Sequence, residues 1–479
     1  MKTTLLSIAF ILTAFTFCNA QASLLATATT GGAYGYGTIL KGDSTGHNFT
    51  VVHNFAITDS FTPNGSYPVG KMAVADNGII YCITELGGYG DSCTICTLNP
   101  ITGDFNMIYQ FYETQQFGAV PVAGIIKASN GLLYGGTPNG GANYAGVIYS
   151  VDPATNTYTD VFDFPTNMTN TSVGLLSELL QAEDGNLYGI VSVGPDSGSD
   201  GVLFSFNPVN RQYTPLANLG IINISSDLRT PPLVQGPNHK IYGVFQTESY
   251  VGLMGSAGIL FSYDLSNNQM TNLHIFSDTS GLPSGGLFIA NGNVYGETNG
   301  TTYYNSNQAE FFNNGQIYSY NIAANTFTTL AWLDSATGVC PVGGLGMLGN
   351  DRLTGSFAYG GANNQGALFT FNLANNTFTT LLDFDSATTG ANPQCDIVEA
   401  NFTATGIAPV TALVPMVYPN PCTGALYIQN AQPNTPYSIT NTLGQVVDRG
   451  ILNSSTQQID ISALAAGMYL INNVKFIKQ

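Results

Sequence analysis

Charged side chains are scarce in this chain, and basic ones are the scarcest. Asp, Glu, Lys and Arg make up 8% of the 479 residues, and 29 acidic against 11 basic residues give a formal net charge of −18. A nucleic-acid groove needs clustered Lys and Arg to neutralise phosphates, so this composition excludes nucleic acid as a partner. The many Asn, Thr, Gly and Tyr indicate a surface that forms hydrogen bonds rather than ion pairs.

Familiar catalytic and metal-binding patterns are missing as well. The chain has no Gly-x-Ser-x-Gly elbow, no His-Glu-x-x-His helix and no calcium-loop pattern of Asp residues. Of the four His, His53 and His274 fall at the same step of equivalent segments, which predicts surface positions on an outer strand. We therefore expect no cofactor and no metal, and we favour a binding protein over an enzyme.

After the N-terminus, the chain has no apolar run long enough to span a membrane. Residues 1–20 combine an early Lys, an apolar run and small residues before Gln21, which is typical of a secretory signal peptide. Cys18 leaves a lipoprotein anchor as an alternative, although the residues before it are not the small ones that usually precede a lipidated Cys. We expect an exported chain without a transmembrane segment.

Six Cys remain after such a cleavage, and an even number in an exported protein permits disulfides. Cys340 and Cys395 lie beside equivalent Pro-led segments, which predicts a bridge between adjacent repeats. Cys82 and Cys93 flank one predicted hairpin and form the second candidate pair, with Cys96 left free. Cys93 and Cys96 have zinc-like or redox-like spacing, but no second Cys pair or His cluster accompanies them.

What the chain does contain is a repeat of about 53 residues. A polar turn, an aliphatic residue, Tyr and Gly, as in "NGLLYGG", recur with landmarks at Tyr81, Tyr134, Tyr188, Tyr242 and Tyr295, with Thr354 in the sixth place and Ala26 in an earlier copy. Each copy ends in an alternating strand with apolar residues six positions apart: Phe49–Phe55, Phe105–Phe111, Tyr158–Phe164, Tyr213–Leu219, Met270–Phe276, Phe327–Leu333 and Phe378–Phe384.

The N-terminal copy lacks the apolar strand that opens the others. These openers start at Pro68, Pro121, Ser172, Pro232, Pro283 and Pro341, and a spare one follows the last copy at Asn392. Four short strands per repeat and complementary ends predict an all-β, seven-bladed β-propeller over residues 21–400. Residues near 393–400 would close it by pairing with the N-terminal strands. A solenoid is the alternative, but it would need polar caps instead of complementary half-repeats.

The repeat resembles two known groups of proteins. The run "GVIYSVDPATNTYTDVFDFP" is similar to the second half of a kelch repeat, with Gly140–Gly141, Tyr149 and Tyr158 at comparable places. It departs from kelch because the only Trp, Trp332, is not at the kelch landmark. "GLLYGGTPNGG" and "GNVYGETNG" look like the Gly-Leu-Tyr-Gly-Thr tandem repeats of exported bacterial proteins. These resemblances imply a propeller and no single activity.

The repeat period stops at Asn401. Residues 401–412 have the composition of a linker, and 413–479 predict six or seven strands in a small β-sandwich. This module closely resembles the type A sorting domain of the type IX secretion system of Bacteroidetes, on landmarks that include Pro419, Asn420, Pro421, Gly424, Gly444, Leu464, Gly467, Tyr469 and Lys478. The resemblance implies recognition by that machinery at the outer membrane and removal of the module by a sortase-like peptidase. The product would then be released or attached to the surface.

Loops between the second and third strands carry many Tyr: Tyr34, Tyr36, Tyr89, Tyr144, Tyr250, Tyr303, Tyr304 and Tyr359. Tyr and Asn on exposed loops suit stacking on sugars or docking of a partner. We therefore predict a secreted or cell-surface binding propeller with a glycan or surface polymer as ligand; rings that pack beneath their own loops are the structural alternative. Two rival functions stay open: a polysaccharide-degrading enzyme with loop carboxylates such as Asp91, Glu248 or Glu310, and a structural or adhesive surface protein.

Overall fold

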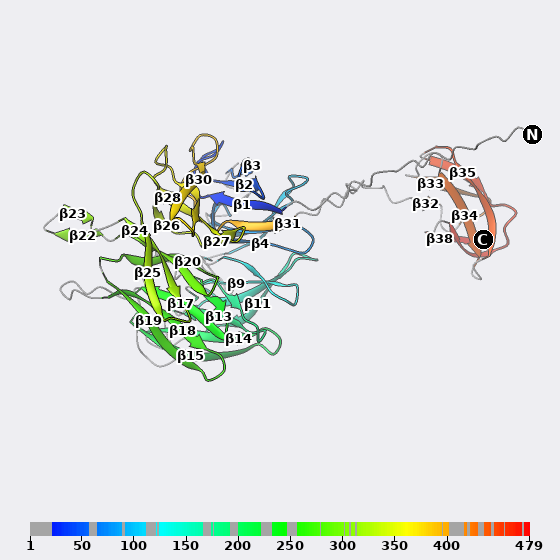
Figure 1. Cartoon of the computed structure of the whole chain (residues 1–479). Helices are drawn as coiled ribbons and strands as arrows, with labels where there is room; N and C mark the ends of the chain where they lie inside the picture. The colour runs from blue at the N-terminus through cyan, green and yellow to red at the C-terminus, as the bar shows by residue number, and fades with distance from the viewer. Residues whose placement is uncertain are drawn as a thin grey trace, which may run out of the picture. The chain divides into compact units, whose positions relative to one another are not determined.

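The computed structural model divides the chain into two compact units, Met1–Thr403 and Ala404–Gln479 (Figure 1). It describes residues 22–56, 65–88, 92–111, 121, 124–165, 174–175, 177–191, 200–221, 232–246, 256–277, 279–300, 302–305, 308–311, 314–394, 396–401, 416–418, 422–429, 435–441, 445–454, 456–471 and 474–479. All elements named within these ranges are β-strands, as the alternating sequence pattern predicts.

The first unit consists of antiparallel sheets, one for each sequence repeat. Seven main sheets occur in the described part of this unit, and in six of them the strands run in sequence order. These six contain β4 (Ser66–Val74), β5 (Ile80–Leu86), β6 (Thr94–Leu98) and β7 (Phe105–Gln110); β8 (Ile126–Lys127), β9 (Leu133–Gly136), β10 (Val147–Asp152) and β11 (Thr157–Asp163); β12 (Leu180–Gln181), β13 (Leu187–Val191), β14 (Asp200–Asn207) and β15 (Gln212–Ile221); β16 (Val234–Gly236), β17 (Lys240–Gln246), β18 (Ser256–Asp264) and β19 (Gln269–Ser277); β20 (Leu282–Ala290), β21 (Asn293–Asn299), β24 (Gly315–Asn321) and β25 (Thr326–Trp332); and β26 (Val339–Pro341), β27 (Gly346–Leu348), β28 (Arg352–Tyr359), β29 (Ala367–Asn372) and β30 (Thr377–Asp383).

The seventh sheet combines strands from both ends of the unit. Its order is β3 (Thr50–Asn54), β2 (Thr38–Asp43), β1 (Ala22–Ala28) and β31 (Val398–Asn401), so that the blue and orange strands lie side by side in Figure 1. Residues 22–25 of β1 pair antiparallel with 398–401 of β31. One face of this sheet packs against Met72 and Ile80 of the following repeat, and the other packs against Leu368 of the last repeat.

Turn chemistry explains much of the recurring phrase. Between β10 and β11, Asp152 Oδ1 accepts a hydrogen bond from Ala154 N at 2.9 Å, and Asn156 adopts a left-handed φ of 56°. Asn is favoured at both kinds of position because its short side chain caps the turn and tolerates positive φ. Left-handed residues recur at the equivalent step of the later repeats, at Arg211, Asn268, Asn325 and Asn376. The landmark Tyr81 then donates its hydroxyl to Asn156 Oδ1 of the next sheet at 2.7 Å.

Every outer strand of the seven sheets carries a register shift that the sequence pattern does not reveal. In β30 the shift falls where Leu368 pairs with Leu382 but Phe369 pairs with Thr380, which leaves Leu381 as an extra residue. Thr380 is exposed and Leu381 is partly buried. The expectation of one alternating face from Phe378 to Phe384 is therefore wrong, because a bulge interrupts the two-residue period.

Aromatic stacking joins neighbouring sheets through these outer strands. Tyr109 stacks on Tyr158 of the next sheet with ring centroids 3.6 Å apart. His53 stacks on Phe105 at 3.9 Å, and His274 on Phe327 at 3.6 Å. Both His lie on outer strands as predicted, and each is only partly exposed because its ring fills a contact between sheets. Burial lowers the pKa of His53 to about 4.

The second unit contains two sheets around its own core. One has the order β32 (Met416–Tyr418), β33 (Ala425–Gln429) and β36 (Thr456–Asp460), and the other β35 (Val446–Leu452), β34 (Thr435–Asn441), β37 (Gly467–Ile471) and β38 (Val474–Lys478). Leu426 and Ile459 from the first sheet meet Ile439, Ile471 and Phe476 from the second. This arrangement fits the predicted small sandwich of six or seven strands.

Candidate functional site

The loops between second and third strands are held by their own glycines and by a cap from the outer strand. Gly140 and Gly141 have φ of 81° and 79°, and a Cβ on Gly141 would lie 2.6 Å from Asp163 Oδ1. That same oxygen accepts a hydrogen bond from Ala142 N at 2.6 Å. Asn54 and Asp383 cap the equivalent loops in the same way. Backbone geometry therefore requires the Gly pairs, and they do not by themselves indicate a ligand.

Three of the predicted Tyr side chains are exposed, two on these loops and one, Tyr359, at the end of β28 where such a loop begins. Tyr34, Tyr144 and Tyr359 are 63%, 60% and 51% exposed. Tyr144 holds a φ of 58°, which its loop imposes because bulky residues rarely adopt this conformation. Tyr36 behaves differently: its ring packs edge-on against Tyr67 with centroids 5.7 Å apart, so it matches the alternative of a ring that packs under its loop.

Seven other predicted site residues, or their side chains, lie outside the described part of the chain. Tyr89, Tyr250, Asp91 and Glu248 lie outside the described residues. The longest insertion forms a hairpin of its own from β22 (Thr302–Asn305) and β23 (Gln308–Phe311), which the sequence does not predict. Tyr303, Tyr304 and Glu310 belong to these strands, and their side chains lie outside the described part of the chain.

Besides the predicted Tyr side chains, the structure brings together a second set of residues that the sequence analysis did not predict, and we call it the inner set. It takes one residue from near the start of each sheet, always directly before a buried apolar residue: Lys71, Gly124, Glu178, Pro232, Gly286, Gly344 and Asp396. Neighbouring members touch one another. A Cβ on Gly124 would lie 2.6 Å from Glu178 Oε1 and 2.5 Å from Lys71 N, and one on Gly286 would lie 2.7 Å from Gly344 Cα. The set therefore brings together residues that are far apart in the sequence.

The charges of the inner set are concentrated on one side. Lys71 Nζ forms an ion pair with Asp396 Oδ2 at 3.3 Å, and Gly344 N donates a short hydrogen bond to Asp396 Oδ1. The Asp396 carboxylate raises the pKa of Lys71, and Glu178 adds to this effect. A single ammonium thus lies between two carboxylates that come from different repeats.

Glu297 of β21 is a further acidic group beside this set. Its side chain is completely buried, and neither carboxyl oxygen has a hydrogen-bond partner among the residues that the structure describes. Burial, with a smaller contribution from the Asp396 carboxylate, raises the pKa of Glu297 well above its usual range. The Tyr318 hydroxyl is also buried, with no hydrogen-bond partner among the described residues; burial raises its pKa, and Glu297 adds to this effect. Sequence reasoning missed Glu297, although an alignment of the repeats would have shown it.

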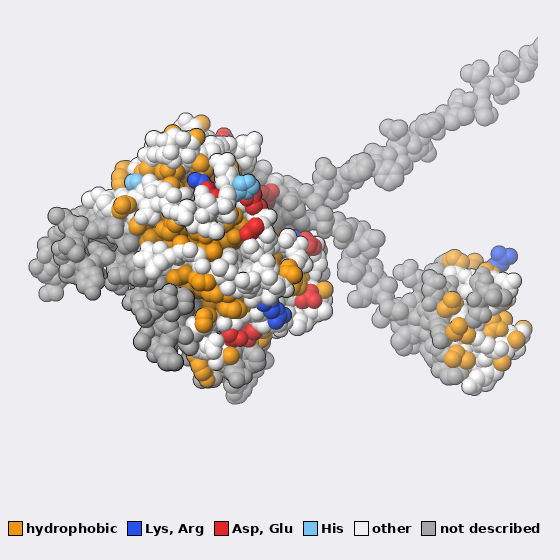
Figure 2. All heavy atoms as spheres, turned by 90° about the horizontal axis from the view of Figure 1, so that it is seen from below, with side chains coloured by type: hydrophobic (Ala, Val, Ile, Leu, Met, Phe, Trp, Pro, Cys, Tyr) orange, Lys and Arg blue, Asp and Glu red, His pale blue; other side chains and the backbone are white. Residues whose placement is uncertain are grey.

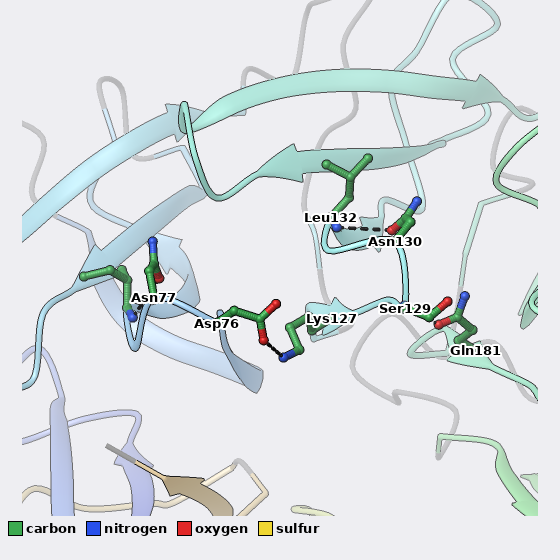
Figure 3. A network of polar contacts seen from close by, with 8 residues as sticks. Asp76, Asn77, Lys127, Ser129, Asn130, Leu132 and Gln181 are labelled. Carbon is green, nitrogen blue, oxygen red and sulfur yellow. Dashed lines mark hydrogen bonds and ion pairs between the residues drawn. The ribbon is translucent and has the colours of Figure 1, made fainter. Parts of the chain in front are cut away.

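Polar clasps join the turns between the first and second strands (Figure 3). Gln181 of β12 reaches back to the preceding sheet, where its Oε1 accepts a hydrogen bond from Ser129 N at 2.6 Å. Gln235 accepts in the same way from Glu183 N at 2.7 Å, and Lys127 forms an ion pair with Asp76 at 2.5 Å. These contacts repeat from sheet to sheet, so they are explained by stability rather than by ligand binding.

Few charged side chains lie on the face of the first unit that is seen in Figure 2, where hydrophobic and uncharged polar groups predominate. The described residues contain no cluster of three or more His, Cys, Asp or Glu side chains arranged to hold a metal ion. Within the described part of the chain, no helix is long and apolar enough to cross a membrane.

Comparison with known proteins identifies both parts of the chain. The Gloeobacter/Verrucomicrobia repeat matches residues 15–250 and 178–411, which together cover most of the sequence. The chain belongs to this repeat family. The secretion system C-terminal sorting domain matches residues 416–475. No curated protein is significantly similar to the chain.

Solved structures are similar to this Gloeobacter/Verrucomicrobia repeat protein over most of its length. A candidate 6-phosphogluconolactonase from Bacteroides fragilis has a TM-score of 0.50 at 11% identity, over 80% of this chain and 98% of its own. The periplasmic gluconolactonase of Pseudomonas aeruginosa has a TM-score of 0.49 at 14% identity, over 79% and 99%. At such identities the likeness concerns the fold, which is all-β and propeller-like.

The sorting domain determines where this repeat-family protein acts. It marks an exported protein of the cell surface or the extracellular space, and it implies contact with the type IX secretion machinery. Of the predicted landmarks, Gly424, Leu464, Gly467, Tyr469 and Lys478 are described, whereas Pro419, Asn420, Pro421 and Gly444 lie outside the described residues. Tyr469 is 8% exposed and donates its hydroxyl to Ala465 O at 2.9 Å, and Leu464 packs against the core of the module.

The cysteines of the first unit are placed differently from the sequence expectation. The register of β5 and β6 puts Cys82 opposite Cys96 and not opposite Cys93. Cys93 Sγ instead contacts Glu85 O at 3.0 Å. Strand pairing therefore replaces Cys93 with Cys96 as the neighbour of Cys82. Cys340 is half-buried in β26, and Cys395 lies outside the described residues, so a bridge between them stays a prediction.

Proposed function

We propose that the seven sheets of the first unit are the blades of a closed β-propeller. The pairing of β1 with β31 supports closure, because it completes a four-stranded sheet from the two ends of the unit. Contacts along the inner set support it too, since the Lys71–Asp396 ion pair joins the second repeat to the C-terminal opener. In this arrangement the inner set surrounds the propeller axis, and the domain extends over residues 21–400, followed by a linker at 401–412 and the sorting module at 413–479.

We infer that this surface propeller is a binding module that recognises a glycan or another surface polymer. The observation that carries the proposal is the exposure of Tyr34 and Tyr144 on loops fixed by internal hydrogen bonds, and of Tyr359 at the end of β28 beside the third such loop. Rigid exposed rings bind sugars with a small loss of conformational entropy, and a surface poor in charge favours an uncharged, hydroxyl-rich ligand. After removal of a signal peptide at 1–20, a sortase-like peptidase would remove the sorting module.

Binding and hydrolysis assays on the same protein test this proposal. The parent protein should bind a subset of glycans on an array, and a variant with Ala at Tyr34, Tyr144 and Tyr359 should lose that binding while it keeps its thermal stability. Trp332→Ala is the matched control, because Trp332 is an aromatic residue with similar exposure (54%) on an outer strand. Equal binding by the triple variant would contradict the proposed site. Release of reducing sugar from a polysaccharide panel would favour the enzyme instead.

A further inference from the structure

Glu297 stands where the other repeats bury apolar or small side chains. Two residues after the landmark, the equivalent positions hold Ala28, Ile83, Gly136, Ile190, Val244 and Ser356, and all of them are buried. A carboxyl group at such a step costs several kcal/mol of solvation unless a partner compensates it. Within the described residues neither oxygen of Glu297 has a hydrogen-bond partner. The sheet would fold more easily with Ile at this step, so the acid requires another explanation.

Further oxygen atoms gather at the same place. Ser284 of β20 is the register partner of Glu297, and its hydroxyl is also buried without a hydrogen-bond partner in the described part of the chain. Gly285 follows it with a φ of 62°, and a Cβ there would lie 2.7 Å from both Glu297 Oε2 and the carbonyl oxygen of Gly343 in the next sheet. A glycine therefore keeps the space between a carboxyl and a carbonyl oxygen free of side-chain atoms.

We propose that Glu297, Ser284 and the Gly343 carbonyl bind a divalent cation, and that this cation is Ca²⁺. All three donors are oxygens, and hard cations such as Ca²⁺ prefer carboxylate, hydroxyl and carbonyl ligands with water in the remaining positions. A small ion also suits a group that is completely buried, because a larger ligand could not reach it without displacing its neighbours.

The surrounding charges favour a cation at this point. Asp396 lies close enough to Glu297 to raise the pKa of Glu297, and the ion pair that the structure gives Lys71 is with Asp396. Because the Lys71 ammonium is paired with the Asp396 carboxylate, it is not the counterion of Glu297. Protein modules that work outside the cell commonly bind Ca²⁺ with Kd values on the order of 0.1–1 mM, which is the range we expect here.

Titration of the EDTA-treated full chain with CaCl₂ tests the proposal. We expect saturable binding by calorimetry and a rise in Tm with Ca²⁺. We also expect Tb³⁺ luminescence sensitised by a nearby Tyr, for which Tyr318 is the candidate. Glu297→Gln keeps the size of the side chain and should weaken Ca²⁺ binding by more than about tenfold. Glu297→Ile copies the sister repeats and should abolish binding, while Ser284→Ala should weaken it.

Asp351→Asn provides the control, since Asp351 is an exposed carboxylate on a turn. This variant should bind Ca²⁺ with the same affinity as the parent protein. The proposal is overturned if the parent binds no Ca²⁺ at millimolar concentrations. It is also overturned if folded Glu297→Gln and Ser284→Ala variants both bind as the parent does. Glu297 would then be a neutral carboxylic acid, or a buried water would be its hydrogen-bond partner. Because glycan binding is measured without added Ca²⁺, either result leaves the proposed function separately testable.

Discussion

Removal of the C-terminal opener should destabilise the whole first unit, although it deletes only one short strand of it. A chain that stops after Asn392 lacks β31, which pairs with residues 22–25 of β1. It also lacks Ile397 and Ala400, which are 8% and 2% exposed, and it leaves Lys71 without Asp396. Burial of an Ile contributes about 1.5–3 kcal/mol and each net backbone hydrogen bond about 1 kcal/mol, so the loss is on the order of 5 kcal/mol.

Such a loss is comparable to the total stability of a domain, which is about 5–15 kcal/mol. The matched control stops after residue 412, which removes the sorting module but keeps β31. Urea unfolding followed by tyrosine fluorescence should show a much lower midpoint for the shorter chain, or aggregation through the open edge of β1. Equal midpoints for the two chains would refute closure by shared strands.

Three further predictions follow from contacts described above. Gln181→Ala removes the clasp on Ser129 N and should lower stability by about 0.5–1.5 kcal/mol in urea unfolding; a loss within error would show that the clasp is redundant. His53 has its pKa lowered to about 4, so its contribution is complete above its unfolded value near 6.5 and is lost as pH falls towards 4, by at most about 1.4 kcal/mol per pH unit. His53→Phe should flatten this acid limb of the stability curve, and unchanged acid sensitivity would contradict the assignment. Deletion of 413–479 should retain a folded protein in the periplasm of a bacterium with type IX secretion, as measured by fractionation, and full surface yield would argue against a sorting role.

The repeated strands and turns were predictable because their causes are local. Asp152 and Asn156 act within one turn, and the burial of Tyr81 follows from the sequence pattern of its own strand. The register shifts of the outer strands were not predictable, since the bulge at Leu381 depends on how β30 meets β29. The partial burial of His53 was not predictable for the same reason: its ring stacks on Phe105 in the next sheet, and nothing in its own strand signals that contact.

The inner set consists of contacts between residues that lie far apart in the sequence but at equivalent positions of the repeat. Lys71 and Asp396 are separated by most of the first unit, so no local pattern connects them. Once the spare opener at Asn392 is assigned to the sheet that the N-terminus begins, however, the two residues become equivalent positions in adjacent sheets, and their contact follows. Glu297 requires one step more. Its departure from Ile83 and Ile190 is visible in the sequence. Its significance lies in two carboxyl oxygens that have no hydrogen-bond partner among the described residues and that lie beside a carbonyl of the next sheet, and only the packing of the sheets brings these groups together.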